Sequence, residues 1–178
     1  MLAPFWRAAA RIAARPAVTA WLIRRAQRTP YVHITGPDGS VYMERYWLFN
    51  AYQPESSGKR PWWQFPISIR LHRIMRADDD RGHLHDHPWN ARTMILDGWY
   101  AEEREGHVFQ PKWMTTIIRR QAGDTATLRF GEFHRIIEVS PGGVWTLFIT
   151  GRYRGVWGFD VNGRKVPWRE FLGLPPKE

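Results

Sequence analysis

The sequence predicts an all-β domain of the sandwich or barrel kind, preceded by a helical segment. From residue 31 onward, short runs rich in β-branched and aromatic residues are separated by turn signals about every 8 to 15 residues. Residues 1–30 instead place apolar residues at helical spacing. A chain of 178 residues can bury a core, and 11 Trp, 9 Phe and 6 Tyr are available to fill it. We therefore expect a helical extension over 1–30 and a single domain over 31–178.

The helical extension divides at a proline. Residues 3–14 are rich in alanine and place Trp6 and Ile12 on an apolar stripe, so we expect an amphipathic helix there. Pro16 ends this helix or opens a second one, which continues through 17–28. Pro30 restricts the residue before it and marks the end of the helical part.

The β part begins with a hairpin, because two alternating runs flank a turn at residues 36–39. A polar loop is expected at 53–61, a bend at Gly98 and a helical turn within 166–172. The expected strands are, in order, 31–34, 41–49, 67–75, 83–87, 93–96, 100–103, 115–120, 125–130, 134–139, 145–149 and 154–159.

The net charge of +9 is concentrated at the N-terminus. Residues 1–28 hold six arginines and no acidic residue, whereas the rest of the chain holds 20 basic and 17 acidic residues. Arg7, Arg11 and Arg15 are four apart and form a stripe beside the apolar one, so we first expect these helices to dock on the barrel or on a partner subunit. Peripheral contact with an anionic membrane is the second interpretation. Nucleic acid ranks last, since no known binding motif accompanies the arginines.

Features that the sequence lacks exclude or disfavour several classes of protein. The chain has no cysteine, so disulfides and thiolate metal sites are excluded. It has no uninterrupted apolar run of the roughly 18 residues that a membrane span needs, and no apolar segment followed by a small-residue cleavage site. We therefore expect a cytoplasmic protein.

Histidines are the strongest functional signal. His83, His85 and His87 alternate, so in a β-strand they would project from one face, and His134 lies in a later apolar run. Neutral imidazole is the commonest metal ligand in proteins. A pair from one strand and one residue from another would make a three-histidine site with open coordination positions.

Two stretches resemble the two motifs of the cupin superfamily. The first motif is HxH, three or four residues, Glu, six residues and Gly, which His85, His87 and Gly98 match. The second is Gly, five residues, PxG, two residues, His, three residues and Asn, in which Gly123, Gly131 and His134 fall in place. The resemblance covers roughly residues 65–155, and the sequence around the histidines is similar to that of small bacterial and phage-encoded cupin-like proteins.

The resemblance implies a jelly-roll (double-stranded β-helix) barrel of two packed antiparallel sheets, with a divalent transition metal held by His85, His87 and His134. Iron is the metal we expect first, with Zn, Mn, Ni and Cu as alternatives. Three motif positions depart: Ala91 replaces the usual Glu ligand, Arg129 the usual Pro and Glu138 the usual Asn. The missing ligand leaves more open positions, unless a nearby carboxylate substitutes, for which the options are Glu102, Glu103 and Glu138.

Other polar residues are candidates for roles around the metal. His83 could be a fourth ligand, a group behind a ligand or a proton carrier, and Glu138 a proton carrier or a solvated rim carboxylate. Asp86 alternates away from the histidines and is expected to orient a neighbouring loop or a donor group behind a metal ligand. An arginine beside the metal would pair with an anionic substrate, although each candidate could instead face solvent. The arginines considered are Arg129, Arg119 and Arg70, and His72 is a further residue that could reach the lumen.

Two functional hypotheses follow, together with a weaker third. The first is a metal-dependent enzyme, an Fe(II)-type dioxygenase or related oxidoreductase acting on a small anionic substrate. The second is a non-catalytic cupin that binds a small molecule or holds only a stabilising metal. A metal-independent isomerase or epimerase is the third, and the paired HxH ligands argue against it. A homodimer through sheet edges would cover hydrophobic edge strands.

Overall fold

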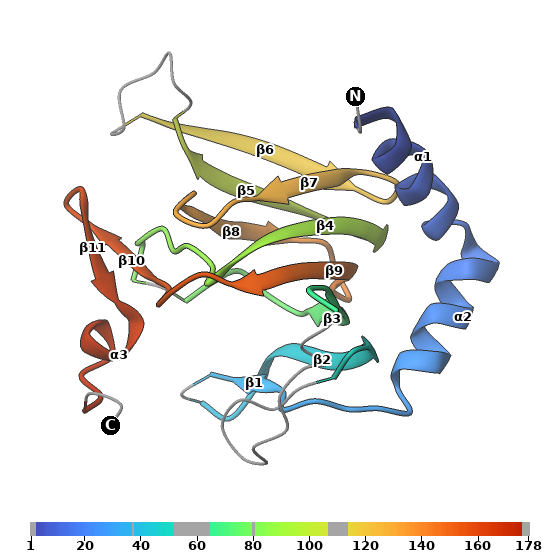
Figure 1. The fold of residues 1–178 in the computed structure, drawn as a ribbon, viewed down its shortest axis with the longest axis horizontal. Coiled ribbons are helices and arrows are strands. Elements are labelled where there is room, and N and C mark those ends of the chain that lie inside the picture. The colour runs from blue at the N-terminus through green and yellow to red at the C-terminus, as the bar shows by residue number, and fades with distance from the viewer. Residues whose placement is uncertain (1–2, 37, 52–64, 80, 107–113, 176–178) are drawn as a thin grey trace.

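The computed structural model describes residues 3–36, 38–51, 65–79, 81–106 and 114–175. Its strands form two layers that face each other, with two helices along one side and a small hairpin with a third helix at the opposite end (Figure 1). No helix among these residues is long and apolar enough to cross a membrane.

The larger sheet has six antiparallel strands in the order β1-β2-β3-β9-β4-β7. The chain neighbours β3 and β4 lie on either side of β9, which arrives from much later in the sequence. The bounds are β1 Ile34–Thr35, β2 Val41–Phe49, β3 Ser68–Ile74, β4 Trp89–Asp97, β7 Thr125–Leu128 and β9 Val144–Tyr153.

The second layer consists of a three-stranded sheet, β6-β5-β8, and the hairpin β10-β11. Its strands are β5 Trp99–Glu105, β6 Thr115–Gln121, β8 His134–Val139, β10 Gly158–Val161 and β11 Arg164–Pro167. The segment around His85 joins the two parts, because His85 forms a bridge to His134 on one side and to Phe159 on the other. The loop that carries the histidines is thereby part of the second layer.

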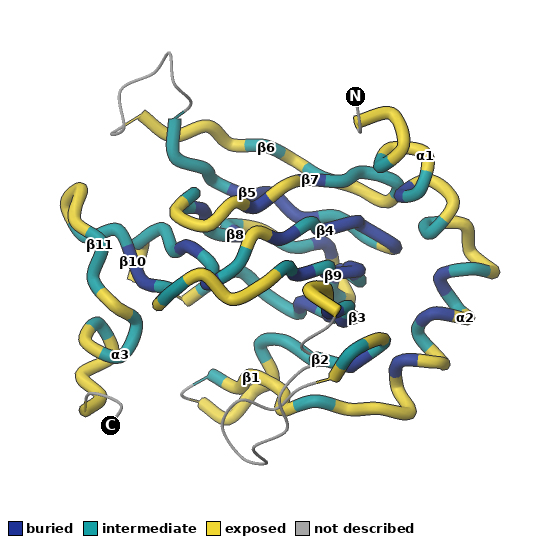
Figure 2. The backbone as a smooth tube through the Cα atoms, in the orientation of Figure 1, coloured by how far each residue is buried: buried dark blue, intermediate teal, exposed yellow. Residues whose placement is uncertain are grey.

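Burial follows the two layers. Between them, β3, β4 and β9 contribute Ile74, Ile95 and Val144 to a cluster with Tyr100 and Ile136 from the smaller sheet. Alternate residues of the same strands point outward, as strand geometry requires. Figure 2 shows the buried backbone concentrated in the middle strands and the inward sides of the helices.

The helices α1 Ala3–Ala13 and α2 Pro16–Ala26 cover the outer face of the six-stranded sheet. Ala10, Leu22 and Ala26 are buried against Leu71 and Leu147 in one apolar cluster. The docking interpretation of the arginine-rich segment is confirmed in its first form, docking on the barrel. The proline at residue 16 opens the second helix at its first position, where the missing N–H costs nothing.

Most expected elements are present within a few residues, and β2 and β8 have the predicted bounds. Three predictions need correction. The expected strand at 83–87 is an irregular segment with a single bridging residue, His85. The expected first strand at 31–34 is replaced by β1, and the expected last one becomes the hairpin β10–β11, after which α3 Trp168–Phe171 follows. Most of the predicted loop at 53–61 lies outside the described residues.

The bend between β4 and β5 depends on Gly98. Its φ is +77°, a value that residues with a Cβ rarely adopt. A Cβ at this position would lie 2.6 Å from the Ser140 Oγ and 2.7 Å from the Gly143 carbonyl oxygen. The predicted bend is thus confirmed, and the close approach of the β8–β9 turn adds a second reason for glycine.

Candidate metal centre

The structure brings His85, His87 and His134 together between the two layers. One ring nitrogen from each residue lies within 4.8 Å of those of the other two, so this histidine triad could hold a metal ion. The Nε2 atoms of His87 and His134 are 2.8 Å apart. His134 is buried, and His85 and His87 are partly buried.

Backbone hydrogen bonds fix two of the three histidines relative to each other. His134 begins β8, and its N–H and carbonyl exchange hydrogen bonds of 2.9 and 2.8 Å with the backbone of His85. His87 follows two residues later, immediately before Pro88, which has no N–H and ends the irregular segment. The triad is therefore built by a pairing between residues far apart in sequence, and not by one strand alone.

Asp86 points away from the triad and fastens the segment that carries it. Its side chain is fully buried, and its Oδ1 accepts a hydrogen bond of 2.8 Å from the Gly158 N–H. Its Oδ2 forms an ion pair with the Nζ of Lys165 in β11. The prediction that Asp86 orients a neighbouring segment is confirmed, and that segment is the β10–β11 hairpin.

Glu102 supports the triad from behind. Its carboxylate is fully buried in β5, and its Oε2 lies 3.2 Å from the Nδ1 of His134. A carboxylate acceptor at Nδ1 favours the tautomer with its proton there, which leaves Nε2 as the lone-pair nitrogen facing the other histidines. The sequence offers Glu102 as a possible substitute ligand, whereas in the structure its carboxylate contacts the Nδ1 of His134.

Two arginines neutralise Glu102. The Nε of Arg104 lies 3.0 Å from its Oε1, and the Nε of Arg120 donates to the same oxygen. Burial by itself raises the pKa of Glu102, but the hydrogen bond from His134 and the charges of both arginines outweigh it and lower that pKa to about 2. Glu102 is therefore ionised across the physiological range.

The environment keeps His87 and His134 neutral. Burial, and then the nearby His134 and His85, lower the pKa of His87 well below its usual value. Burial also lowers the pKa of His134, although the contact with Glu102 opposes this. Metal binding requires the neutral imidazole, so these shifts favour ligation over protonation at neutral pH.

The donor set suits a divalent transition metal. Two nitrogens each about 2.0–2.1 Å from one ion and roughly perpendicular would be separated by about 3 Å, close to the distance between His87 and His134. Ala91, at the position of the usual fourth ligand, is buried in an apolar cluster with Leu128 and Phe148. Within the described part of the chain, the site therefore offers three nitrogens and no carboxylate ligand.

The predicted proton carriers lie outside the triad. The Nδ1 of His83 is 3.0 Å from the carbonyl oxygen of Asp160, and its ring packs edge-on to Phe171 with centroids 5.3 Å apart. Glu138 has an exposed side chain further along β8 than His134. Neither residue is part of the cluster of three metal-capable side chains.

The three predicted arginines have different surroundings. Arg129 is exposed, with an i,i+3 contact to Glu132, and Arg119 is exposed over the ring of Trp99. Arg70 is buried on β3, with its guanidinium 4.9 Å from the ring centroid of Trp47 and 4.7 Å from that of Trp89. Its charge contributes to the low pKa of His87, so Arg70 is the predicted arginine that the fold brings toward the triad.

His72 lies on the same side of β3 as Arg70. It is buried, its ring lies 5.1 Å from that of Phe148, and its Nε2 has no hydrogen-bond partner among the described residues. Burial, followed by the charges of Arg70 and Arg45, lowers its pKa well below the usual value.

Comparisons with known proteins support the fold. No family model and no curated protein matches the sequence. A mutant of oxalate decarboxylase from Bacillus subtilis aligns with a TM-score of 0.51 at 14% identity, over 87% of this chain and 33% of that chain. This chain thus spans about a third of that protein's length.

Two further structures are similar at lower scores. A cupin 2 conserved barrel domain protein from Rhodopseudomonas palustris has a TM-score of 0.47 at 15% identity, over 75% of this chain and 77% of that chain. A cupin-2 domain protein from Rhodospirillum rubrum has a TM-score of 0.44 at 14% identity, over 68% and 67%. The chain has the cupin fold, as the resemblance of its two motifs predicted.

Proposed function

We propose that this protein is a metal-dependent enzyme, of the Fe(II)-type oxygenase or a related oxidoreductase class, that acts on a small anionic substrate. The observation that carries the proposal is the histidine triad whose member His134 is oriented by the ionised Glu102. Structural metal sites are closed by protein ligands, whereas three protein ligands leave positions for substrate and O₂ or water.

The protein residues would divide the work. His85, His87 and His134 would hold the metal, with iron expected first and Zn, Mn, Ni or Cu as alternatives. When bound, such an ion supplies Lewis-acid or redox chemistry. Glu102 would keep the Nδ1 proton of His134 in place, so that Nε2 remains a donor.

The substrate's anionic group would be paired by Arg70. Its guanidinium is planar, always charged and close to the rings of Trp47 and Trp89. In the pairing of β3 with β9, Arg70 lies next to Phe148. The Phe148 ring lies 5.7 Å from that of His87, which connects the arginine's surroundings to the triad. His83, Glu138, Arg119 and Arg129 are not needed in this proposal.

Elemental analysis tests the metal. Wild type, the double variant His85→Ala/His134→Ala and the control His83→Ala are purified from medium with all five metals. We expect near-stoichiometric metal in wild type and His83→Ala, and its loss in the double variant. No metal in the wild type after reconstitution, or equal metal in all three proteins, would contradict the proposal.

A non-catalytic cupin that binds a small molecule or a stabilising metal is the second candidate. The apolar Ala91 in place of a ligand and the aromatic surroundings of Arg70 favour it. Nitric oxide binding to the Fe(II)-loaded protein, followed by electron paramagnetic resonance, separates the two. An adduct shows an open coordination position and supports the enzyme, whereas a loaded protein without an adduct supports the alternative. A homodimer through sheet edges stays a prediction.

A further inference from the structure

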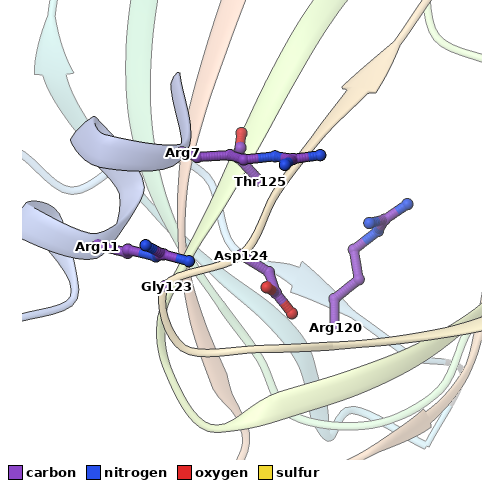
Figure 3. A pocket seen from close by; sticks show the side chains of 6 residues that line it. All are labelled: Arg7, Arg11, Arg120, Gly123, Asp124 and Thr125. Carbon is purple, nitrogen blue, oxygen red and sulfur yellow. The ribbon is translucent and has the colours of Figure 1, made fainter. Parts of the chain in front are cut away.

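Two adjoining cavities lie between α1 and the turn that joins β6 to β7, away from the histidine triad. Their volumes are about 340 and 320 Å³, and both are lined by Arg7, Arg120 and Thr125. Figure 3 shows Arg7 and Arg11 extending from α1 and Arg120 from β6 around this space. The arginines that line the cavities are Arg7, Arg11, Arg92, Arg104 and Arg120.

The lining carries an excess of positive charge. Arg7 and Arg11 form no ion pair or hydrogen bond with any residue that the structure describes, and Arg92 donates only to the Thr125 hydroxyl at 3.2 Å. Asp124 also lines the space, but its Oδ2 accepts a hydrogen bond of 2.9 Å from the Gln121 N–H and so caps the turn. Five guanidinium groups are thus accompanied by two carboxylates: Asp124 in the lining, and Glu102 behind Arg104 and Arg120.

One of these arginines is buried with an unused donor. Arg104 is 11% exposed, and its Nη1 donates to the Thr127 carbonyl at 3.0 Å. Its Nη2 is buried and has no hydrogen-bond partner within the described part of the chain. An unmade hydrogen bond at a buried donor is unfavourable, so a ligand that accepts it would be stabilised.

We infer that these cavities bind a small anion bearing phosphate groups. Guanidinium groups bind phosphate oxygens in a bidentate manner, and a cavity lined by one sign of charge concentrates anions. Five guanidinium groups against the two carboxylates of Asp124 and Glu102 leave an excess of three positive charges, which a single carboxylate cannot neutralise. The arginines come from four elements, α1, β4, β5 and β6, and surround one space, which suits a compact anion better than a nucleic-acid backbone or a membrane surface.

The inference is independent of the proposed metal function, although the two sites share contacts. Arg104 and Arg120 line the cavities and also hold Oε1 of Glu102, whose other oxygen contacts His134. An anion in the cavities would therefore lie beside the two arginines that hold Glu102, the residue that contacts His134.

Isothermal titration with inorganic pyrophosphate tests the site. The full chain is titrated in the presence of EDTA, so that a metal at the triad cannot bind the anion. The test variant is Arg7→Gln/Arg11→Gln, and the matched control is Arg24→Gln/Arg25→Gln, which removes two exposed arginines of α2 that line neither cavity. We expect saturable binding that the test variant weakens at least tenfold and the control changes by less than twofold.

Two results would overturn the inference. The first is the absence of saturable binding in the wild type. The second is an equal loss in both double variants, which would show that overall charge binds the anion. Binding to a single-stranded oligonucleotide and to anionic-lipid vesicles is measured as well. If the protein binds either of them, pyrophosphate does not displace it, and both double variants weaken that binding alike, the result also counts against the cavities. Circular dichroism checks that the variants fold, and Arg11→Glu provides a second test variant.

Discussion

At the scale of single residues, the contact between Glu102 and His134 decides what the site can do. A buried carboxylate that accepts the Nδ1 proton of a histidine orients the ring and increases the basicity of the other nitrogen. The carboxylate is itself held by two arginines, so its charge is compensated in a buried place. This arrangement explains how His134 can be oriented without the usual fourth ligand beside it.

Replacing Glu102 with Gln should weaken metal binding roughly 10- to 100-fold, the usual effect of losing such a partner. The amide preserves the shape but removes the charge that stabilises the His134 tautomer. Competition with a chromophoric chelator measures the affinity. The matched control is Glu103→Gln, because Glu103 is the next residue of β5 and pairs instead with Arg135 and Thr115. Equal weakening by both variants would show that Glu102 has no special role.

His72 predicts a pH dependence of stability. Its pKa in the folded protein lies well below the value of about 6.5 in the unfolded chain. Below pH 6.5 the unfolded chain therefore binds a proton that the folded protein does not, and the free energy of unfolding falls as the pH falls. The contribution is fully present above this pH, and is lost progressively below it.

The variant His72→Phe removes this titration and should keep the contact with Phe148. Between pH 7 and 5.5 it should lose about 1 kcal/mol less stability than the wild type, the amount expected for one such group. Urea unfolding at both pH values, with EDTA to remove metals, measures the difference. Parallel losses in the two proteins would show that His72 is protonated in the folded state.

At the scale of elements, a bend and a short irregular segment position the triad. Gly98 reverses the chain between β4 and β5 and so sets β5, with Glu102, in the layer opposite β4. The histidine segment is held between β8 and β10 by single bridges at His85. Such local pairing depends on the neighbouring strands, and this is why period-two alternation alone did not describe residues 83–87.

Replacing Gly98 with Ala should destabilise the protein by at least about 1 kcal/mol more than Gly39→Ala. Both positions have a positive φ, 77° and 78°, so both variants carry the backbone cost of about 1–2 kcal/mol. Only at Gly98 does the new Cβ meet other atoms, whereas nothing lies within 4 Å at Gly39. Urea unfolding of the two variants compares them, and equal losses would mean that the β8–β9 turn moves away at little cost.

At the scale of the whole molecule, the N-terminal helices complete the hydrophobic core on the outer face of the larger sheet. The cluster joins Ala10, Leu22 and Ala26 with Leu71, Met94 and Leu147 of the sheet. The same docking forms one side of the arginine-lined cavities, since α1 supplies Arg7 and Arg11. The helical segment thus has a buried apolar side and a cationic side.

The variant Leu22→Asp should destabilise the protein by about 3 kcal/mol or more, because it buries an unpaired charge in this cluster. The adjacent Trp21 is 57% exposed, so Trp21→Asp serves as the control and should cost under about 1 kcal/mol. Thermal unfolding measures both. If Leu22→Asp were as stable as the control, the helices would not be essential to the core.

The sequence by itself determined the fold class, the helical extension and the identity of the three clustered histidines. These depend on local periodicity and on two motifs with fixed spacing, which are properties of short stretches of chain. The tertiary structure decided which of the candidate polar residues lie near the triad. Arg70, Arg119 and Arg129 look alike in sequence, yet only Arg70 is buried on an inward-facing strand position.

The selection of Glu102 over Glu103 and Glu138 required the pairing of β5 with β8, where a register irregularity lies between Ala101 and Glu102. The arginine-lined cavities required α1, β4, β5 and β6 to meet at one place. Strand register and the docking of helices depend on contacts between residues distant along the chain, and periodicity carries no information about them.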